Sequence, residues 1–142
     1  MITVFTEEHL DAAADAEQRC FSVPWSKEAL RLLVSPIGFG LVATVNGELA
    51  AYGGIMCVAD EAQILNVATL PEHRRKGLAK EILSGLYKEA KARGAVTVTL
   101  EVRESNGAAR DLYISEGFSE IGVRPGYYTN PREAAIIMEK RL

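Results

Sequence analysis

One stretch of the sequence decides the fold: Ile64-Leu65-Asn66-Val67-Ala68-Thr69-Leu70-Pro71-Glu72-His73-Arg74-Arg75-Lys76-Gly77-Leu78-Ala79-Lys80. It begins as an apolar run typical of a buried strand, which Leu70-Pro71 ends, and a basic turn with Gly77 then leads into an amphipathic helix. Backbone N–H groups at a helix start have no intrahelical partner, and the helix dipole adds partial positive charge there. Arg74, Arg75 and Lys76 place three cations where that dipole disfavours them. A docked anion offsets this repulsion, so the stretch predicts a phosphate-binding turn.

Two common phosphate-binding loops are absent from the sequence. It contains no G-x-x-x-x-G-K-[ST] and no G-x-G-x-x-G after a strand, which excludes a P-loop and a Rossmann fingerprint. The turn carries the pattern Arg74-x-x-Gly77-x-Ala79 instead. The downstream sequence therefore has to identify the molecule that carries the phosphate.

The composition predicts one globular domain over residues 1–142, long enough to bury a core. Hydrophobic residues make up 48% of the chain and charged residues 25%, as in soluble proteins. There is no signal-peptide pattern and no apolar run of membrane-spanning length, so we expect a cytoplasmic protein without a membrane partner. The net charge of −3 argues against direct nucleic-acid binding. Cys20 and Cys57 lack metal-site spacing, so we expect reduced thiols and no metal.

The first half of the chain alternates short strands and helices. Its predicted elements are a strand at 2–5, a helix from the cap Thr6 to about residue 18, a helix from the cap Ser26 to residue 34, and strands at 39–45 and 48–58. Asn46-Gly47 joins the last two strands and suits the positive φ angles of a type I′ hairpin turn.

The second half predicts strands at 63–69, 96–102, 118–123 and 134–139, helices at 76–92 and from Ser105 or Asn106 to Gly117, and a loop at Pro125-Gly126-Tyr127-Tyr128. In the strand at 96–102, Val96, Val98, Leu100 and Val102 point to one side, and Thr97, Thr99 and Glu101 point to the other. A hairpin feeding a strand–helix–strand unit gives the α+β class. We expect a mixed, mostly antiparallel sheet of about seven strands between helices, in three α/β/α-like layers.

Three residues of the second half are candidates for chemistry, although each has an ordinary structural explanation. Glu101 fits a solvated strand residue or a partner for Arg103. Tyr113 fits core packing on a short helix, and Asn106 fits a helix cap. Their combined order and spacing indicate a shared site.

That combined pattern carries a family resemblance. Leu100-Glu101-Val102-Arg103-x-Ser105-Asn106-x-Ala108-Ala109-x-x-Leu112-Tyr113-x-x-x-Gly117-Phe118 resembles a signature of the GNAT N-acetyltransferases. The turn Arg74-x-x-Gly77-x-Ala79 resembles the pyrophosphate loop of the same family, [Q/R]-x-x-G-x-[G/A]. With Pro24-Trp25-Ser26, Tyr127-Tyr128 and Ala135-Ile136-Ile137-Met138, the resemblance extends to the RimI-type N-terminal acetyltransferases of ribosomal proteins and spans nearly the whole chain.

The resemblance implies acetyl-CoA as co-substrate and a role for each motif. The backbone of Val67, Ala68 and Thr69 would pair with the pantetheine arm, and Arg74 with Arg75, Lys76, Gly77, Leu78, Ala79 and Lys80 would hold the pyrophosphate. Asn106 would contact the cofactor near its thiol-bearing arm. Tyr113 would stand beside the thiol sulfur as general acid, and Glu101 would be the general base.

These residue types suit acetyl transfer to an amine. An α-amino group has a pKa of about 7.7–8.0, so at neutral pH a carboxylate has to remove a proton before it attacks. The departing thiol has a pKa of about 8.5 and an ordinary phenol about 10, so a tyrosine can protonate the thiolate at little cost. Backbone N–H groups of the opened strand can stabilise the oxyanion, and no metal is required.

The acceptor is the open part of the sequence-based hypothesis. The resemblance implies the N-terminal α-amine of a protein, with the N-terminal alanine of a small-subunit ribosomal protein as partner. The alternatives are a GNAT enzyme that acetylates a lysine or a small-molecule amine, and a non-catalytic acetyl-CoA-binding module. Trp25 either packs the first helices or lies beside the acceptor groove. Tyr127 and Tyr128 either form the acceptor wall or cover the sheet end, and the oligomeric state stays open.

Overall fold

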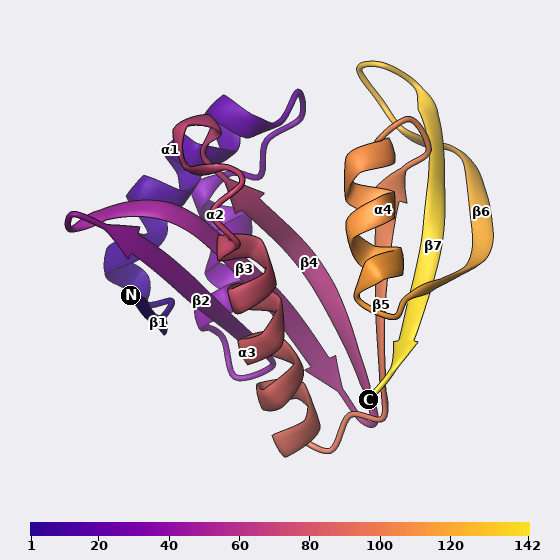
Figure 1. Ribbon diagram of the computed structural model, residues 1–142, viewed down its shortest axis with the longest axis horizontal. Coiled ribbons are helices and arrows are strands. Elements are labelled where there is room, and N and C mark those ends of the chain that lie inside the picture. The colour runs from indigo at the N-terminus through magenta and orange to yellow at the C-terminus, as the bar shows by residue number, and fades with distance from the viewer.

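The hairpin around Asn46-Gly47 forms as the sequence predicts. In the computed structural model, which describes residues 1–142, Asn46 has a φ of 53° and Gly47 a φ of 79°. Two consecutive positive φ angles are the mark of a type I′ turn, whose twist matches that of the strands it joins. The turn connects β2 (Gly38–Val45) to β3 (Glu48–Val58), as Figure 1 shows.

Five further strands complete a seven-stranded sheet. They are β1 (Ile2–Val4), β4 (Glu61–Thr69), β5 (Thr97–Arg103), β6 (Ser119–Tyr128) and β7 (Glu133–Arg141). The spatial order is β1-β2-β3-β4-β5-β7-β6, and every neighbouring pair is antiparallel except β4 and β5. The mixed, mostly antiparallel sheet expected from the sequence is confirmed.

The parallel pairing of β4 with β5 is short. It joins only Glu61–Gln63 to Thr97–Thr99, and beyond these residues the two strands diverge (Figure 1). A register shift between β3 and β4 leaves Leu65 without a partner at the point of divergence. A bulge of this kind bends its strand and ends the pairing, and bulges are common beside active sites. The outer edge of β4 therefore has no strand partner from its middle to Thr69.

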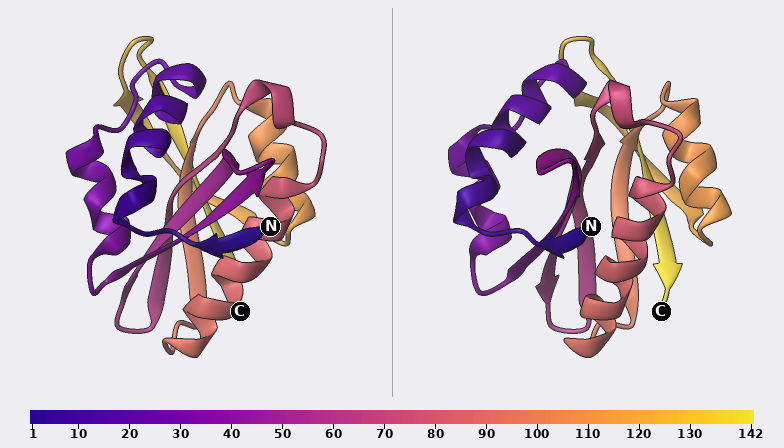
Figure 2. Two further views of the ribbon diagram at one scale, coloured as in Figure 1. Left: turned by 90° about the vertical axis from the view of Figure 1, so that its left-hand side faces the viewer. Right: turned by 60° about the vertical axis from the view of Figure 1, so that its left-hand side comes forward.

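Four helices cover the sheet in two layers (Figure 2). A 3-10 turn, η1 (Glu7–His9), precedes α1 (Leu10–Cys20), and α2 (Lys27–Leu30) continues as the 3-10 turn η2 (Arg31–Val34). These elements pack on one face of the sheet. The 3-10 turn η3 (Pro71–His73) leads to α3 (Leu78–Ala92), which covers the other face together with α4 (Gly107–Ser115). The three-layer arrangement is as expected. None of the helices combines the length and the apolar composition that a membrane span requires.

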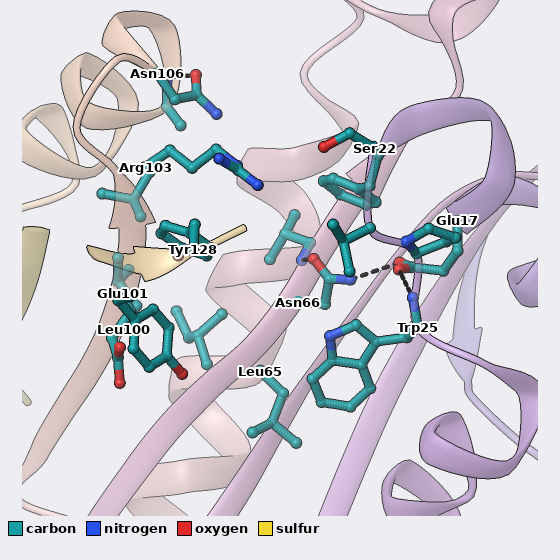
Figure 3. A pocket seen from close by; sticks show the side chains of 18 of the residues that line it. Glu17, Ser22, Trp25, Leu65, Asn66, Leu100, Glu101, Arg103, Asn106 and Tyr128 are labelled. Carbon is teal, nitrogen blue, oxygen red and sulfur yellow. Dashed lines mark hydrogen bonds between the residues drawn. The ribbon is translucent and has the colours of Figure 1, made fainter. Parts of the chain in front are cut away.

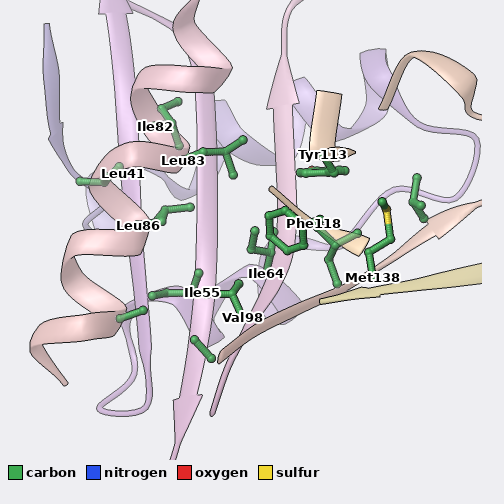
Figure 4. Packing of buried hydrophobic residues seen from close by; sticks show 14 of the residues in the cluster. Leu41, Ile55, Ile64, Ile82, Leu83, Leu86, Val98, Tyr113, Phe118 and Met138 are labelled. Carbon is green, nitrogen blue, oxygen red and sulfur yellow. The ribbon is translucent and has the colours of Figure 1, made fainter. Parts of the chain in front are cut away.

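The larger part of the core lies under α3 and α4 (Figure 4). The apolar face predicted for α3 is buried at Ile82, Leu86 and Ala90, and it packs against β2, β3 and β4. Burying each Leu or Ile side chain contributes about 1.5–3 kcal/mol, so this face holds α3 firmly against the sheet. The start of α3, and with it the basic turn, is thereby fixed relative to β4.

Two helix boundaries differ from the sequence prediction. The helix expected from Lys76 begins at Leu78, because Gly77 adopts a φ of 77° that is incompatible with an α-helix. The segment expected to form one helix after Ser26 is α-helical only to Leu30 and then tightens into η2. Ser26 caps it as predicted, accepting a hydrogen bond from the Ala29 N–H.

Two strand predictions were wrong in detail. Val96 was expected within the strand, on the same side as Val98 and Leu100, but β5 begins only at Thr97 and Val96 is 55% exposed. The loop expected at Pro125–Tyr128 lies within β6, and the turn to β7 comes after Tyr128. β6 is an edge strand, where a proline without an N–H breaks no ladder, and a register shift between Arg124 and Tyr128 absorbs the extra residues.

Candidate functional site

A cleft of about 600 Å³ opens where β4 and β5 diverge (Figure 3). Residues from five parts of the chain line it. They include Glu17 and Trp25 from α1 and the segment after it, Leu65, Asn66 and Val67 from β4, Leu100, Glu101 and Arg103 from β5, Asn106 and Tyr113 from α4 and its cap, and Tyr127 and Tyr128 from β6. The cleft therefore brings together Val67, Asn106, Glu101 and Tyr113, which the sequence singled out separately.

The free edge of β4 presents backbone groups to this cleft. The Leu70 N–H donates to the Ala50 carbonyl. From this bond back to Asn66, β4 pairs with β3 residue by residue without a register shift. Because backbone groups alternate along a strand, Ala68 faces β3, whereas Val67 and Thr69 face the open edge. Within the predicted segment, Val67 and Thr69 thus face a ligand at the open edge, where the Val67 N–H contacts Asn66 Oδ1 and the Thr69 carbonyl contacts Arg74. The side chain of Ala68 is buried under α1 and α2.

The basic turn exposes six consecutive backbone N–H groups. Those of residues 75–80 make no hydrogen bond within the chain. Arg75 has a φ of 64° and Gly77 a φ of 77°, a conformation that turns successive N–H groups toward a common point. No carboxylate forms an ion pair with Arg75, Lys76 or Lys80. Unpaired donors and unpaired cations together favour a polyanionic ligand at the start of α3.

Arg74 takes a different position from its two basic neighbours. Its Nε donates to the Thr69 carbonyl oxygen over 3.1 Å, so its side chain turns back toward the end of β4. The Cys20 thiol approaches the same oxygen at 3.6 Å. Arg74 therefore ties the turn to β4, and its remaining guanidinium donors stay available.

Glu101 lies on β5 with its side chain only 16% exposed. Its Oε2 is buried and has no hydrogen-bond partner, and the Nε of Arg124 stands 3.8 Å away. A buried carboxylate oxygen without a donor is costly and rare in folded proteins, so a functional reason is expected for it. Glu101 does not serve as the ion-pair partner of Arg103, because Arg103 pairs with Glu133 instead.

Tyr113 packs its ring edge-on against Phe118, with the ring centroids 5.5 Å apart. The residue is 9% exposed, and burial, with the nearby Tyr128, raises the pKa of Tyr113 to about 12. The phenol therefore keeps its proton at neutral pH. Complete proton transfer to a thiolate of pKa about 8.5 is uphill by about 5 kcal/mol, which makes a hydrogen bond to the sulfur the more favourable role.

Replacing Tyr113 with Phe tests that role, because the ring and its packing on Phe118 are kept. For the acetyl transfer that the sequence resemblance implies, we expect kcat to fall about tenfold, below the usual range for full acid–base catalysis, with an unchanged melting temperature. Tyr87→Phe is the matched control, since the Tyr87 ring also packs against Phe118 and its hydroxyl contacts Glu116. A melting temperature that falls together with activity in Tyr113→Phe would show that the hydroxyl serves only the core.

Asn106 is the N-cap of α4. Its Oδ1 accepts a hydrogen bond from the Ala109 N–H over 3.1 Å, as a capping residue does. Its Nδ2 makes no hydrogen bond within the chain, and the residue lines the cleft (Figure 3). The cap and a ligand contact are therefore compatible.

Arg103 organises one wall of the cleft. Its guanidinium donates to the carbonyls of Thr129 and Pro131 and to Glu133, and it stacks over the Tyr128 ring at 4.5 Å. Hydrogen bonds from Ser105, together with Arg103, lower the pKa of Glu133 below its usual range. The turn after β6 and the tyrosines at its base are thus held against β5.

Sequence analysis missed two polar residues of the cleft, Glu17 and Asn66. Glu17 is completely buried, where α1 presents Leu10, Ala13 and Ala16 to the core. Burial raises the pKa of Glu17, and hydrogen bonds from Tyr52 and the Trp25 N–H act in the opposite direction. The sequence pattern that could have identified Glu17 is a carboxylate at helical spacing on the apolar face of α1. No group of three or more His, Cys, Asp or Glu side chains is arranged to hold a metal ion.

This combination of fold and cleft is that of an acyl-CoA-dependent transferase, and comparison with known proteins identifies the family. The model of the Acetyltransferase (GNAT) family matches residues 10–118. The chain belongs to the GNAT acetyltransferase family.

Relatives within that family cover nearly all of the chain. The [ribosomal protein bS18]-alanine N-acetyltransferase of Escherichia coli (strain K12) is 41% identical over 131 residues, which cover 91% of this chain and 88% of the relative. The enzyme of the same name from Haemophilus ducreyi is 36% identical and covers 97% of each chain. The crystal structure of the ribosomal-protein-S18-alanine N-acetyltransferase from Escherichia coli superposes with a TM-score of 0.90 at 39% identity. It covers 99% of this chain and 94% of that one.

Proposed function

We propose that the chain transfers the acetyl group of acetyl-CoA to the N-terminal α-amine of a protein, and that its acceptor is the N-terminal alanine of ribosomal protein bS18. The observation that carries this proposal is the 41% identity, over 91% of the chain, with a relative named for that reaction. The aligned residues include the segments that line the cleft as well as the basic turn. We place the reaction in the cytoplasm, in agreement with the two free cysteines.

The donor site in this proposal combines the β4 edge and the basic turn. The pantetheine arm would pair as an added strand with the backbone of Val67 and Thr69, which faces the unpaired edge of β4. The pyrophosphate would take the six N–H groups of residues 75–80, with Arg75, Lys76 and Lys80 supplying charge. Asn106 would offer its free Nδ2 to the same arm.

The chemistry of the proposal is direct attack of the amine on the thioester in a ternary complex. Glu101 takes the proton of the ammonium group, directly or through a water, and its Oε2, which accepts no hydrogen bond within the chain, is the acceptor. The Val67 N–H donates to the oxyanion that forms at the thioester carbonyl. The Tyr113 hydroxyl donates to the departing sulfur.

A thiol-release assay over a panel of acceptors tests this function. The panel contains peptides that differ only in their first residue, together with free lysine and spermidine. Release of CoA with peptides that begin with Ala or Ser supports the proposal. Release with the small amines alone replaces it by a small-molecule acetyltransferase, and tight acetyl-CoA binding without release replaces it by a binding module.

The acceptor wall can be tested through Arg103. Replacing Arg103 with Met keeps an apolar stem and removes the bonds that hold the turn after β6. We expect the KM for the peptide to rise several-fold, because Tyr127 and Tyr128 are then held less firmly at the cleft. The affinity for acetyl-CoA should stay that of wild type. An unchanged peptide KM would place the acceptor elsewhere.

A further inference from the structure

A buried carboxylate joins four parts of the chain beside the cleft. Glu17 of α1 accepts hydrogen bonds from the Tyr52 hydroxyl, from the Trp25 backbone N–H at 2.8 Å and from the Asn66 Nδ2 at 2.5 Å. Figure 3 shows Glu17 between Trp25 and Asn66. The residue is fully buried, and the chemistry described above does not use it.

The other end of Asn66 contacts the β4 backbone. Its Oδ1 accepts a hydrogen bond from the Val67 N–H over 3.1 Å. The Val67 N–H faces the open edge of β4, where no strand pairs with it. A carboxylate only accepts hydrogen bonds, so Glu17 determines which end of the carboxamide points toward Val67. The NH₂ group faces Glu17 and the oxygen faces the backbone.

We propose that Glu17 is a positioning residue for acetyl transfer: through the Asn66 carboxamide it fixes the peptide group whose N–H stabilises the thioester carbonyl. This inference rests on the proposed function. A donor at a developing oxyanion is effective when its direction is set in advance, and the free edge of β4 provides no strand partner to set it. One N–H can be shared between two acceptors, so the Asn66 oxygen can hold the Val67 N–H while the thioester carbonyl approaches.

A purely structural role makes a different prediction. If the network only anchors α1 to the sheet, loss of any bond to Glu17 should lower stability and leave kcat alone. Tyr52 separates the two roles, because its hydroxyl donates to Glu17 and makes no bond to Val67. It also accepts a long hydrogen bond of 3.4 Å from the Asn66 Nδ2, which keeps its shorter bond to Glu17 when Tyr52 is replaced. Tyr52→Phe removes one donor and keeps the bond between Glu17 and Asn66.

Glu17→Gln is the main test. In the glutamine one of the two carboxylate oxygens becomes an NH₂ group, so residue 17 no longer requires an NH₂ group from Asn66. The Asn66 carboxamide can then turn over and place its own NH₂ against the Val67 N–H. We expect kcat to fall about tenfold, part of the loss seen when an oxyanion donor is removed, with unchanged affinity for CoA by calorimetry. The acceptor is whichever one the wild-type protein uses. A failure of the proposed function therefore appears in the wild type, and a failure of this inference appears in the ratio of variant to wild type.

A double-mutant cycle with Asn66→Ala separates positioning from anchoring. Asn66→Ala should lower kcat by a similar factor, and adding Glu17→Gln to it should lower kcat no further. Tyr52→Phe should lower the melting temperature with kcat close to wild type. The inference is overturned by wild-type kcat in Glu17→Gln, by additive losses in the double variant, or by an equal kcat loss in Tyr52→Phe. If Glu17→Gln does not fold, wild-type kcat in Asn66→Ala overturns the inference, because Glu17 acts only through Asn66. A lower kcat with intact CoA affinity, together with wild-type kcat in Tyr52→Phe, supports it.

Discussion

Replacing Gly77 with Glu is expected to abolish acetyl-CoA binding. The substitution places a carboxylate among the N–H groups that would hold the pyrophosphate. Two like charges about 4 Å apart near a protein surface repel by about 4 kcal/mol, which lowers affinity by a factor of about 10³. A Cβ at Gly77 meets no atom within 4 Å, so the fold has room for the side chain. Isothermal titration calorimetry with acetyl-CoA measures the effect.

Gly94→Glu is the matched control for backbone strain and charge. Gly94 has a φ of 92°, and an added Cβ there also meets no atom within 4 Å. It follows α3 at the end opposite the basic turn. Equal affinity losses in both variants, or wild-type affinity in Gly77→Glu, would contradict the assignment of the turn to the pyrophosphate.

Glu101→Gln is expected to slow acetyl transfer about 100-fold, at the low end of general base contributions, with acetyl-CoA affinity unchanged. The amide cannot accept the proton of an ammonium group, although its size fits the same site. Steady-state kinetics with the preferred peptide, at saturating acetyl-CoA, give the change in kcat.

Glu104→Gln is the corresponding control. Glu104 lies just beyond β5, three residues after Glu101, and its side chain is exposed to solvent. The same chemical change there should leave kcat at the wild-type value. A Glu101→Gln enzyme within a few-fold of wild type would remove Glu101 from the mechanism.

The sheet could be predicted because each strand shows a recognisable pattern within its own residues. Val98, Leu100 and Val102 alternate with polar residues and are buried as expected. Asn46-Gly47 takes the positive φ angles that its type I′ turn requires. Patterns of this kind depend on residues within one element, so a single sequence contains them.

The details that sequence reasoning missed depend on contacts between distant residues. Glu17 bonds to Asn66 across 49 positions, and Arg103 bonds to the turn after β6 across 26 or more. Pro125 and Gly126 have the composition of a turn, yet the edge position of β6 accommodates them within a strand. Local propensity gives no information on either effect.

The central claim is that acetyl-CoA is the donor and an N-terminal alanine the acceptor. The most direct test is tandem mass spectrometry of a peptide that begins with the N-terminal residues of ribosomal protein bS18 and contains an internal lysine, after incubation with the protein and acetyl-CoA. We predict one acetyl group, located on the α-amine of the first alanine. An acetyl group found only on the lysine ε-amine, or no transfer by a protein that binds acetyl-CoA, would contradict the claim.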